Sequence, residues 1–325
     1  MKSESLQTIR SRTVDLVSEE ELNRRLQESG KTGRPLRIKL GADPSAPDLH
    51  FGHVVVLNKL RTFQELGHQI VFIIGDMTAM IGDPSGRSQT RKPLSHDEVL
   101  RNAATYKEQV STILDPKRTE VRFNSEWCAG LNFEDVLKLS SHVTIAQMLA
   151  REDFSNRYQG NQPISLVEFM YPLIQAYDSV QIEADVEIGG TDQLFNLLLG
   201  RELQKAFGQE PQIVMTLPLL EGLDGVQKMS KSLGNYVAVT DSPREMFGKI
   251  MSVSDDLMWR YADLVLCADD ACLENWREQH PREAKDSLAV ALVNRFHGSG
   301  VGEEASSEFA RVFREKKVPD DMPHV

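Results

Sequence analysis

The segment HQIVFIIGD, at 68–76, limits the possible folds of this chain more than any other stretch. It is short, rich in β-branched and aromatic residues, and apolar at consecutive rather than alternate positions. A strand with this pattern is buried on both faces, as happens where helices cover both sides of a parallel sheet. The sequence therefore predicts an α/β fold.

Strand and helix patterns alternate on both sides of this segment. LRIKLGADPS, at 36–45, predicts a strand that ends in turn residues, and LHFGHVVVLNKLRTFQELG, at 49–67, has a helical period and ends at Gly67. The alternation continues to about residue 220, with an irregular stretch at 127–163 that fits an insertion between the halves of a doubly wound sheet. We predict a Rossmann-like doubly wound parallel sheet with a connective segment at 127–163.

Capping residues predict where two of the helices begin. Ser18 with Glu21 fits the start of a helix that would stop at Gly30, and Ser95 with Glu98 forms a second capping box. These pairs satisfy backbone N–H groups that a helix start leaves without an intrahelical partner.

A second domain is expected because 325 residues are many for a single core. From Pro243 onward only helical patterns remain, and a glycine-bearing loop precedes them. The prediction is a Rossmann-like domain at 1–220, followed at 221–325 by that loop and a smaller all-helical domain.

Charge, cysteine content and hydropathy exclude several classes of protein. The net charge of −11 argues against a basic nucleic-acid-binding surface over the whole molecule, although it allows a local one. The cysteines Cys128, Cys267 and Cys272 are odd in number and lack C-x-x-C spacing, which disfavours a disulfide framework and a zinc knuckle. The N-terminus has no apolar leader, and the run IVFII is too short to cross a membrane. We expect a soluble, cytoplasmic protein without membrane association.

The motif HFGH places His50 and His53 at the start of a predicted helix, with Gly52 between them. A metal site is disfavoured because no third ligand lies nearby, and a lone histidine at a helix start is often a core residue. Glycine in the first turn of a helix lowers helix stability by about 1 kcal/mol relative to alanine. Its presence here therefore favours a flat ligand, such as a nucleobase, that lies against the backbone. Imidazole donors at a helix N-terminus would then bind a polyphosphate.

A second motif, KMSKS, lies far downstream in DGVQKMSKSLGN. It carries Lys228 and Lys231 on a loop bounded by Gly225 and Gly234. Such a lysine pair, taken alone, is usually an ordinary solvated turn. Its combination with HFGH, in this order and across a doubly wound pattern, favours a functional interpretation.

The two motifs together resemble the HIGH and KMSKS signatures of the class I aminoacyl-tRNA synthetases. Only Phe51, in place of isoleucine, departs from them. LGADP, GHVVVLNKLRTFQELGH, IGDPSGRS and GGTDQ extend the resemblance over nearly the whole chain, and specifically to the bacterial tyrosyl-tRNA synthetases. The family fold has a Rossmann-like domain, a connective segment, the KMSKS loop and a helical domain, which matches the organisation predicted above.

The resemblance implies a role for each matching residue. Tyr171, Gln175 and Asp178 also share one face of a predicted helix by their spacing, although that stripe could be an ordinary polar face. With Asp83, the first two would hold the α-amino group of tyrosine, Asp178 would bind its phenol, and Gln193 would lie by its carbonyl. The implied ATP-binding residues are Gly41, Asp43, Gly52, Gly190, Asp192, Met229, Ser230 and Ser232. The implied catalytic residues are Ser45, His50, His53, Arg87, Arg91, Lys228 and Lys231.

Three positions depart from the family pattern. Lys39 stands where many relatives have a tyrosine that touches the phenol, and Leu40 stands where some have a ribose-binding cysteine. Arg87 replaces a common lysine and keeps its positive charge. We therefore expect the phenol to be recognised mainly by Asp178.

The implied reaction joins tyrosine to the 3′ end of tRNA(Tyr). The tyrosine carboxylate attacks the α-phosphorus of ATP, giving tyrosyl-adenylate and pyrophosphate, and the tyrosyl group then moves to the terminal adenosine. Magnesium is expected to arrive with ATP, since no carboxylate cluster for a dedicated metal site is visible. The resemblance also implies a homodimer with an interface around the connective segment.

Three alternatives differ from this interpretation. The related tryptophan-activating enzyme is disfavoured by Asp178, whose carboxylate suits a phenol donor. An inactive RNA-binding paralogue is disfavoured by the intact HFGH and KMSKS motifs, and an HxGH adenylyltransferase that uses no tRNA is disfavoured by the lysine loop and the helical domain.

The helical pattern ends in the segment FREKKVPDDMPHV, at 313–325. The residues that follow form a charged tail that contains proline. Bacterial relatives continue past this point into a small RNA-binding module. We expect the tail to be a linker, adenylate formation to need nothing beyond it, and tRNA charging by this chain to be weak.

Overall fold

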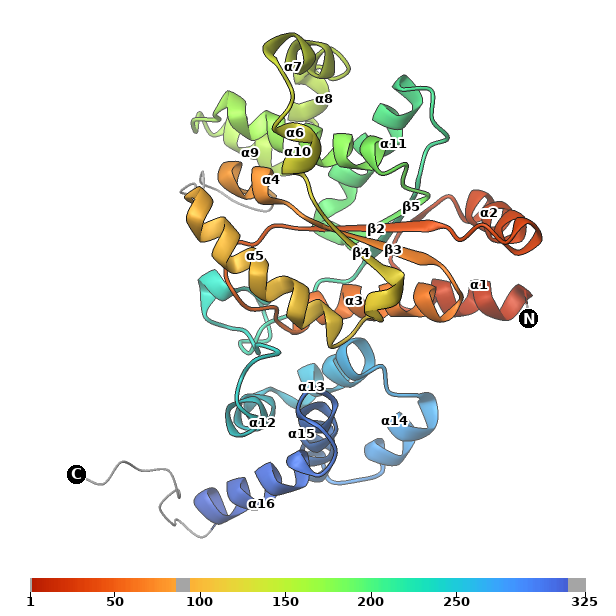
Figure 1. Cartoon of the computed structure of the whole chain (residues 1–325). Coiled ribbons are helices and arrows are strands. Elements are labelled where there is room, and N and C mark those ends of the chain that lie inside the picture. Colours follow the sequence, from red (N-terminus) through yellow and green to blue (C-terminus); the bar gives the residue numbers. More distant parts are fainter. Residues whose placement is uncertain (1, 86–93, 315–325) are drawn as a thin grey trace. The chain divides into compact units, whose positions relative to one another are not determined.

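The computed structural model describes residues 2–85 and 94–314 (Figure 1). Its centre is one six-stranded sheet in the order β1-β6-β5-β2-β3-β4. All neighbouring strands are parallel except β1, which is antiparallel to β6. The strands are β1 (Leu16–Val17), β2 (Arg37–Ala42), β3 (Gln69–Ile74), β4 (Thr119–Phe123), β5 (Val186–Gly190) and β6 (Ile213–Leu217).

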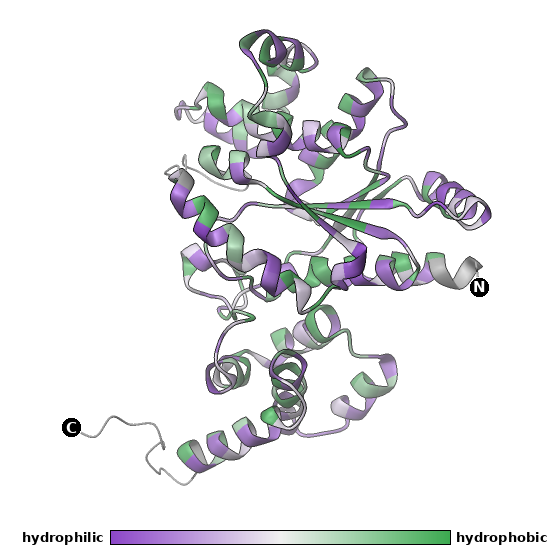
Figure 2. Ribbon diagram, in the orientation of Figure 1, coloured by the Kyte–Doolittle hydropathy of each residue, from purple (hydrophilic) through white to green (hydrophobic). Residues whose placement is uncertain are grey.

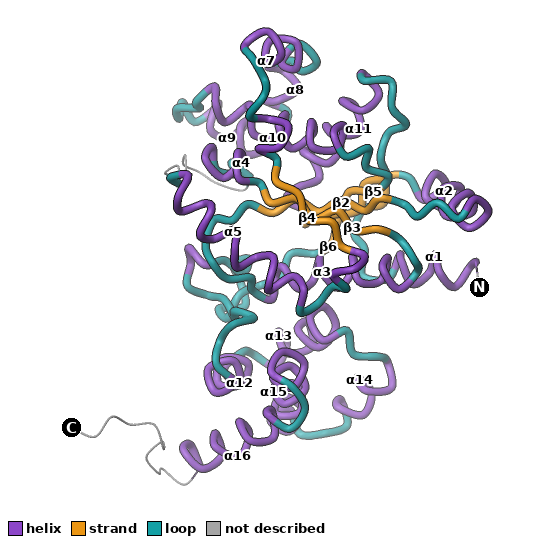
Figure 3. Tube along the Cα trace, in the orientation of Figure 1, coloured by secondary structure: helices purple, strands orange, loops and turns teal. Residues whose placement is uncertain are grey.

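This strand order confirms the predicted doubly wound fold. The chain starts at the centre with β2, adds β3 and β4 on one side, and then returns to add β5 and β6 on the other side. Figure 3 shows the strands running between layers of helices, with α10 (Leu166–Gln181) and α11 (Leu194–Ala206) on one side and α5 (His96–Ser111) on the other. The order in which strands are added to the sheet reverses between β2 and β5, so this is the topological switch point, where ligands bind in such folds.

The predicted central strand is buried as expected. Ile70 to Ile74 in β3 are all at most 1% exposed, and hydrophobic residues run along the strands in Figure 2. The connective segment contains short helices, as its irregular pattern indicated. These helices are α6 (Ser125–Cys128), α7 (Phe133–Ser140), α8 (Ile145–Leu149) and α9 (Glu152–Gln159).

The first predicted helix extends further than expected. It is α2 (Glu19–Thr32), capped by Ser18 as predicted, but it passes through Gly30. The predicted stop is wrong because Gly33, with φ of 74°, takes the left-handed conformation that ends the helix. The sequence also gave no indication of α1 (Lys2–Arg10) or of the two-residue strand β1.

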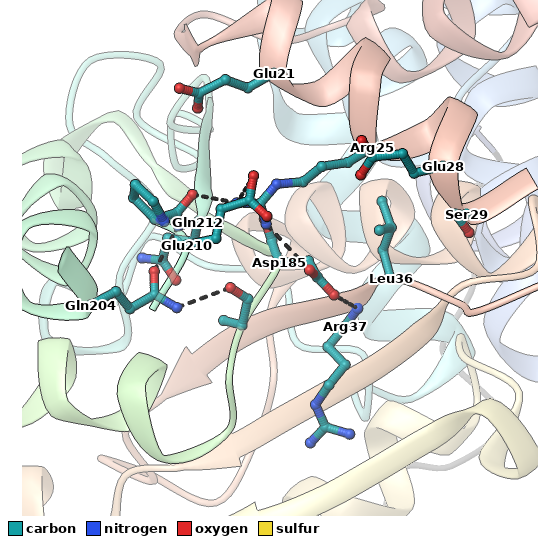
Figure 4. A network of polar contacts seen from close by, with 12 residues as sticks. Glu21, Arg25, Glu28, Ser29, Leu36, Arg37, Asp185, Gln204, Glu210 and Gln212 are labelled. Atoms are coloured by element: carbon teal, nitrogen blue, oxygen red, sulfur yellow. Dashed lines mark hydrogen bonds and ion pairs between the residues drawn. The ribbon is translucent and has the colours of Figure 1, made fainter. Parts of the chain in front are cut away.

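A buried polar network ties α2 to the sheet (Figure 4). The Arg25 guanidinium donates to the backbone oxygen of Asp185 at 3.0 Å and to its carboxylate at 3.2 Å. The same carboxylate accepts from the Arg37 N–H at 2.9 Å, at the start of β2. This network lies at the amino ends of β2 and β5, because Asp185 directly precedes β5 and Arg37 is the first residue of β2.

The chain divides into two compact units. One comprises Met1–Pro47 and Lys59–Pro218, and the other comprises Asp48–Asn58 and Leu219–Val325. The sequence suggested a break near residue 220 but did not indicate that Asp48–Asn58, with the HFGH motif, groups with the second unit. The boundary therefore falls within α3 (Phe51–Glu65).

The second unit is helical after its loop, as predicted. Phe51, the residue that departs from the HIGH signature, is fully buried there and stacks on Phe296 with ring centroids 5.6 Å apart. The remaining helices are α12 (Pro243–Ser252), α13 (Asp255–Tyr261), the π-helix η4 (Ala262–Leu266), α14 (Asp270–Arg277), α15 (Pro281–His297) and α16 (Val301–Arg314). Within the described ranges, no helix is long and apolar enough to cross a membrane.

Candidate active site

A cluster of polar side chains forms at the carboxyl ends of the central strands in the first unit. Asp43 follows β2, and Gln193 follows β5 across the switch point. Asp83 comes after α4 (Asp76–Ile81), the short helix that follows β3. These three predicted residues are brought to the same edge of the sheet because parallel strands end there together.

Asp43 is held in place by both of its carboxylate oxygens. Thr78 Oγ1 donates to Oδ1 at 2.7 Å, and the Tyr171 hydroxyl donates to Oδ2 at 3.0 Å. Burial and the carboxylates of Asp43 and Asp83 raise the pKa of Tyr171 well above its ordinary value, so its hydroxyl stays protonated and remains a donor. A side chain at Gly75 would meet Thr78 and Asp43 at under 2.5 Å, which explains the glycine before α4.

A chain of amide groups joins the predicted residues of the amino-acid pocket. Asn196 Nδ2 donates to Gln175 Oε1 and to Gln193 Oε1, both at 3.0 Å. Gln193 Nε2 then donates to Asp83 Oδ2 at 3.1 Å. This chain fixes the orientation of each amide, because a flipped amide would face donor to donor. Asn196, which is 1% exposed, is a residue that sequence reasoning missed.

Asp178 lies on the same helix, α10, and is 3% exposed. Its Oδ1 accepts a hydrogen bond of 2.8 Å from Nε1 of Trp127, in the connective segment. Burial raises the pKa of Asp178 to about 7, against the opposing effects of Lys39 and of hydrogen bonds from Trp127 and Asn124. A carboxylate this buried is functionally suggestive, because burial penalises its charged form unless a ligand or partner needs it.

The second unit contains the two histidines of HFGH. The His50 N–H donates to His53 Nδ1 at 3.2 Å, and the Gly52 N–H donates to His50 Nδ1 at 3.1 Å. A ring nitrogen that accepts a hydrogen bond carries no proton, so each neutral imidazole has its proton on Nε2. The two rings lie 4.0 Å apart between centroids.

Both histidines are neutral at physiological pH. Burial, His53 and the two loop lysines lower the pKa of His50 far below its ordinary value, and burial lowers the pKa of His53 to about 4. Each imidazole therefore offers one Nε2–H donor rather than a positive charge.

Gly52 has a structural reason that the sequence did not indicate. A Cβ atom at this position would lie 2.9 Å from Cε1 and 3.0 Å from Nδ1 of His50. The sequence predicted that a nucleobase would lie against the backbone at Gly52. In the structure, the ring of His50 occupies the space beside this glycine. The glycine also keeps its N–H accessible to that ring.

The lysine loop is joined to the histidine motif within the second unit. Phe51 N donates to Val237 O at 3.0 Å, and Val239 N donates to Leu49 O at 2.9 Å, on either side of a bridge between His50 and Ala238. Residues 237–239, which follow KMSKS in the sequence, are thus paired with the start of HFGH. The structure brings together the two motifs that the sequence separates by more than 170 residues.

Lys228 and Lys231 give this loop its charge. Both contribute to the lowered pKa of His50, which places them near its ring. Burial lowers the pKa of Lys231 to about 8, and the nearby Asp48 opposes this shift. Lys231 therefore remains mostly cationic at neutral pH and loses its charge just above it.

The shape of the loop depends on Asn235, a second residue that sequence reasoning missed. Its Oδ1 accepts from Ser230 N at 2.8 Å, and its Nδ2 donates to Asp224 Oδ2 at 2.6 Å and to Lys228 O at 3.3 Å. Asn235 is 7% exposed, and a Cβ at Gly222 would lie 2.3 Å from its amide. Its position in KMSKSLGN, next to Gly234 with φ of 67°, is the signal that could have found it.

The remaining predicted residues lie as follows. Ser45 donates its N–H to Asp43 O at 2.7 Å, and Gly41 is exposed near the end of β2. Gly190 ends β5, and Asp192 lines a hollow of about 680 Å³ in the first unit. In the loop, Met229 is 5% exposed, and the hydroxyls of Ser230 and Ser232 lie 2.9 Å apart. Arg87 and Arg91 lie outside the described residues.

In the parts of the chain that the structure describes, no group of three or more histidine, cysteine or acidic side chains could hold a metal ion.

Comparisons with known proteins show which family this chain resembles. The family of class I tRNA synthetases (W and Y) matches residues 31–314. A relative named tyrosine–tRNA ligase, from Oleidesulfovibrio alaskensis, is 56% identical over 98% of this chain and 81% of its own length. Another of the same name, from Thiobacillus denitrificans, is 55% identical over 99% of this chain and 81% of its own length.

A solved structure is similar in fold and sequence. The tyrosyl-tRNA synthetase of Archaeoglobus fulgidus, complexed with L-tyrosine, is 25% identical to this chain, with a TM-score of 0.74. The match covers 94% of this chain and 99% of that one.

Proposed function

Because this chain belongs to the class I tRNA synthetases of the tryptophan and tyrosine family, we propose that it is a tyrosine–tRNA ligase. It activates L-tyrosine with ATP to tyrosyl-adenylate and pyrophosphate, and then transfers tyrosine to tRNA. The observation that carries this proposal is the pairing of HFGH with the segment after KMSKS, at the bridge between His50 and Ala238. That pairing brings the neutral imidazoles of HFGH close to the ammonium groups of Lys228 and Lys231.

The amino acid is tyrosine rather than tryptophan. Asp178 is a buried carboxylate with a pKa of about 7, and a phenol hydroxyl can donate to it. The two ligases compared above, at 56% and 55% identity, are both named for tyrosine.

Tyrosine is oriented by the amide chain of the first unit. Its α-ammonium group binds to Asp83, Tyr171 and Gln175, its carbonyl lies by Gln193, and its phenol donates to Asp178. The hydrogen bonds among these residues already fix their directions before the substrate binds. Such preorganisation lowers the barrier by placing the carboxylate for attack.

The first step needs no general base, because the tyrosine carboxylate is ionised at neutral pH. The chain must instead stabilise the negative charge that develops on the departing pyrophosphate. Lys228 and Lys231 supply positive charge for this, and the Nε2–H groups of His50 and His53 supply donors that keep their protons. Ser45, Arg87 and Arg91 complete the set of residues that we assign to this step.

ATP binds as its magnesium complex, and the metal is part of the substrate. We assign its ribose to Asp192, which lines the hollow beside η2 (Thr191–Gln193). Gly41 and Gly190 allow close approach of the nucleotide to the backbone, we assign Asp43 to the same site, and Gly52 makes room for the ring of His50 in the histidine motif. The lysine loop is presented to the phosphates of ATP by Met229, Ser230 and Ser232.

ATP and tRNA occur together in the cytoplasm, where we expect this enzyme to act.

The active form is a homodimer. A set of large apolar residues on and next to the connective segment is more than half exposed: Phe133, Leu137, Ile145, Tyr158, Leu166 and Val167. Apolar clusters of this kind mark protein interfaces. We define them as the connective face, and we propose that two copies of the chain bury it against each other.

The proposed function is tested by charging an unfractionated bacterial tRNA pool with radiolabelled tyrosine or tryptophan at high tRNA concentration. Tyrosine should enter the tRNA fraction and tryptophan should not, with Lys231→Ala as an inactive control. Transfer of tryptophan in preference to tyrosine would contradict the proposal. Adenylate formation with no transfer at any tRNA concentration would favour an adenylyltransferase that does not use tRNA.

A further inference from the structure

A buried ion pair lies directly behind the wall of the amino-acid pocket. Lys39 in β2 and Glu187 in β5 are register partners in adjacent parallel strands. Their Nζ and Oε1 atoms are 2.8 Å apart, and the two side chains are 0% and 1% exposed. Each is the single charged residue within an otherwise apolar stretch of its strand, IKL and VEI.

All three donors of the Lys39 ammonium are used within the protein. Besides Glu187, Nζ donates to Gln175 O at 2.8 Å and to Ser179 Oγ at 2.7 Å. An ammonium group has three N–H bonds, so none remains for a ligand. Lys39 therefore does not replace the phenol-binding tyrosine that many relatives have at this position.

The pair holds the turn of α10 that carries Asp178. Gln175 and Ser179, the two residues bound by Lys39, flank Asp178 in the sequence. Glu187 binds the same turn as well, because it accepts from Gln175 Nε2 at 3.3 Å and from Ser179 Oγ at 3.0 Å. Gln175 is thus held at both its backbone and its side chain.

Stability alone does not explain such a pair. Removing two charges from water is costly, and a well-packed apolar pair of similar volume is often as stable as a buried ion pair. The surroundings of Asp178 suggest another reason. Lys39 is the strongest influence that favours its charged form, whereas burial and Glu187 oppose that form.

The other groups around Asp178 do not supply a positive charge. Trp127 and Asn124 donate hydrogen bonds to it. Cys128 and Tyr171 are close enough that the Asp178 carboxylate raises the pKa of each. Among the described residues with the largest effects on Asp178, Lys39 is the cation and Glu187 the anion.

We propose that the Lys39–Glu187 pair determines amino-acid specificity by positioning Gln175 and by supplying the positive charge that keeps Asp178 an ionised acceptor for the substrate phenol. This inference rests on the proposed tyrosine-activating function. It makes Lys39 and Glu187 positioning residues, since neither touches the substrate. Their opposite charges then have opposite effects on Asp178.

The test compares Lys39→Met with Glu187→Gln. The ratio of kcat/KM for tyrosine to kcat/KM for phenylalanine is measured by pyrophosphate exchange between pH 5.5 and 9. This ratio cancels ionisations that affect both substrates equally, such as that of Lys231. In the unaltered enzyme it should rise with a midpoint near 7, the pKa of Asp178.

The two variants should shift this midpoint in opposite directions. Lys39→Met should raise it by at least about one pH unit, because a nearby positive charge is lost. The ratio at pH 7 should then fall by about fivefold or more and recover largely by pH 9. Glu187→Gln should lower the midpoint, because a repelling negative charge is lost. A purely structural role would damage both variants without opposite shifts.

Two further variants keep the test decisive. If Lys39→Met does not fold, the neutral pair Lys39→Met/Glu187→Gln replaces it, and its midpoint should still exceed that of the unaltered enzyme. Arg25→Met removes a buried cation at the other end of the same strands (Figure 4) and should leave the midpoint unchanged. Equal midpoints in all variants, or shifts in the same direction, would overturn the inference. Absence of tyrosine-dependent exchange in the unaltered enzyme would instead overturn the proposed function.

Discussion

The tautomers of His50 and His53 illustrate how much chemistry is set by single hydrogen bonds. Each Nδ1 accepts a backbone N–H, so each proton lies on Nε2. The sequence predicted that these imidazoles would donate to a polyphosphate. It could not predict their neutrality, because that depends on burial and on lysines more than 170 residues away.

At the residue scale, Lys231→Ala should slow tyrosyl-adenylate formation by roughly 10²- to 10³-fold, because one charge that stabilises the departing pyrophosphate is lost. The dissociation constant for tyrosine should stay nearly unchanged, since tyrosine is held by residues of the first unit. Stopped-flow fluorescence with tyrosine and ATP measures both quantities. A much weaker affinity for tyrosine at an unchanged rate would refute this role.

Lys231→Arg gives a pH-dependent prediction. Burial lowers the pKa of Lys231 to about 8, so its positive charge is present below pH 8 and is lost as the pH rises through that value. The rate of adenylate formation should therefore decline above pH 8. An arginine stays charged throughout this range, so in the variant the decline should move to higher pH or vanish. An identical decline in both enzymes would assign it to another group.

At the element scale, α10 buries charged and polar residues alongside apolar ones. The spacing of Tyr171 and Asp178 correctly predicted one polar face, but that face is buried, at 6% and 3% exposure. Val167, an apolar residue of the same helix, is instead 52% exposed. Helical periodicity shows that two faces differ, but only the surrounding pocket and connective face decide which one is covered.

The lysine loop is the element whose shape is most easily tested. Asn235→Ala removes the hydrogen bonds to Ser230, Asp224 and Lys228. We expect adenylate formation to slow by about 10- to 100-fold, because small misplacements of catalytic groups are costly. The KM for tyrosine should change little. Asn275→Ala, on the exposed side of α14, is the matched control, and an equal loss in both variants would contradict the role of Asn235.

At the scale of the whole molecule, much of the fold could be predicted because its strands are buried on both faces and its helices are capped locally. Ser18 and Ser95 act as predicted, and β5 and β6 lie where the alternating pattern placed them. The grouping of Asp48–Asn58 with the second unit was not predictable. It depends on strand-like pairing with 237–239, which leaves no periodic signal in either segment.

The proposed dimer gives a prediction at the same scale. Leu137→Glu places a charge in the connective face and should convert the protein to a monomer in sedimentation velocity, because burying an unpaired charge is costly. Leu100→Glu, at a 45% exposed leucine on α5, is the matched control and should leave the dimer intact. A monomer in the unaltered protein at micromolar concentration would contradict the proposal.

The identity of the activated amino acid is the central claim, and ATP–pyrophosphate exchange with each of the twenty amino acids tests it most directly. Tyrosine alone should support rapid exchange, because Asp178 accepts from a phenol and the HFGH and KMSKS groups act on any ATP that is bound. Phenylalanine and tryptophan should support little or none. Exchange that depends on tryptophan, or on no amino acid at all, would contradict the account.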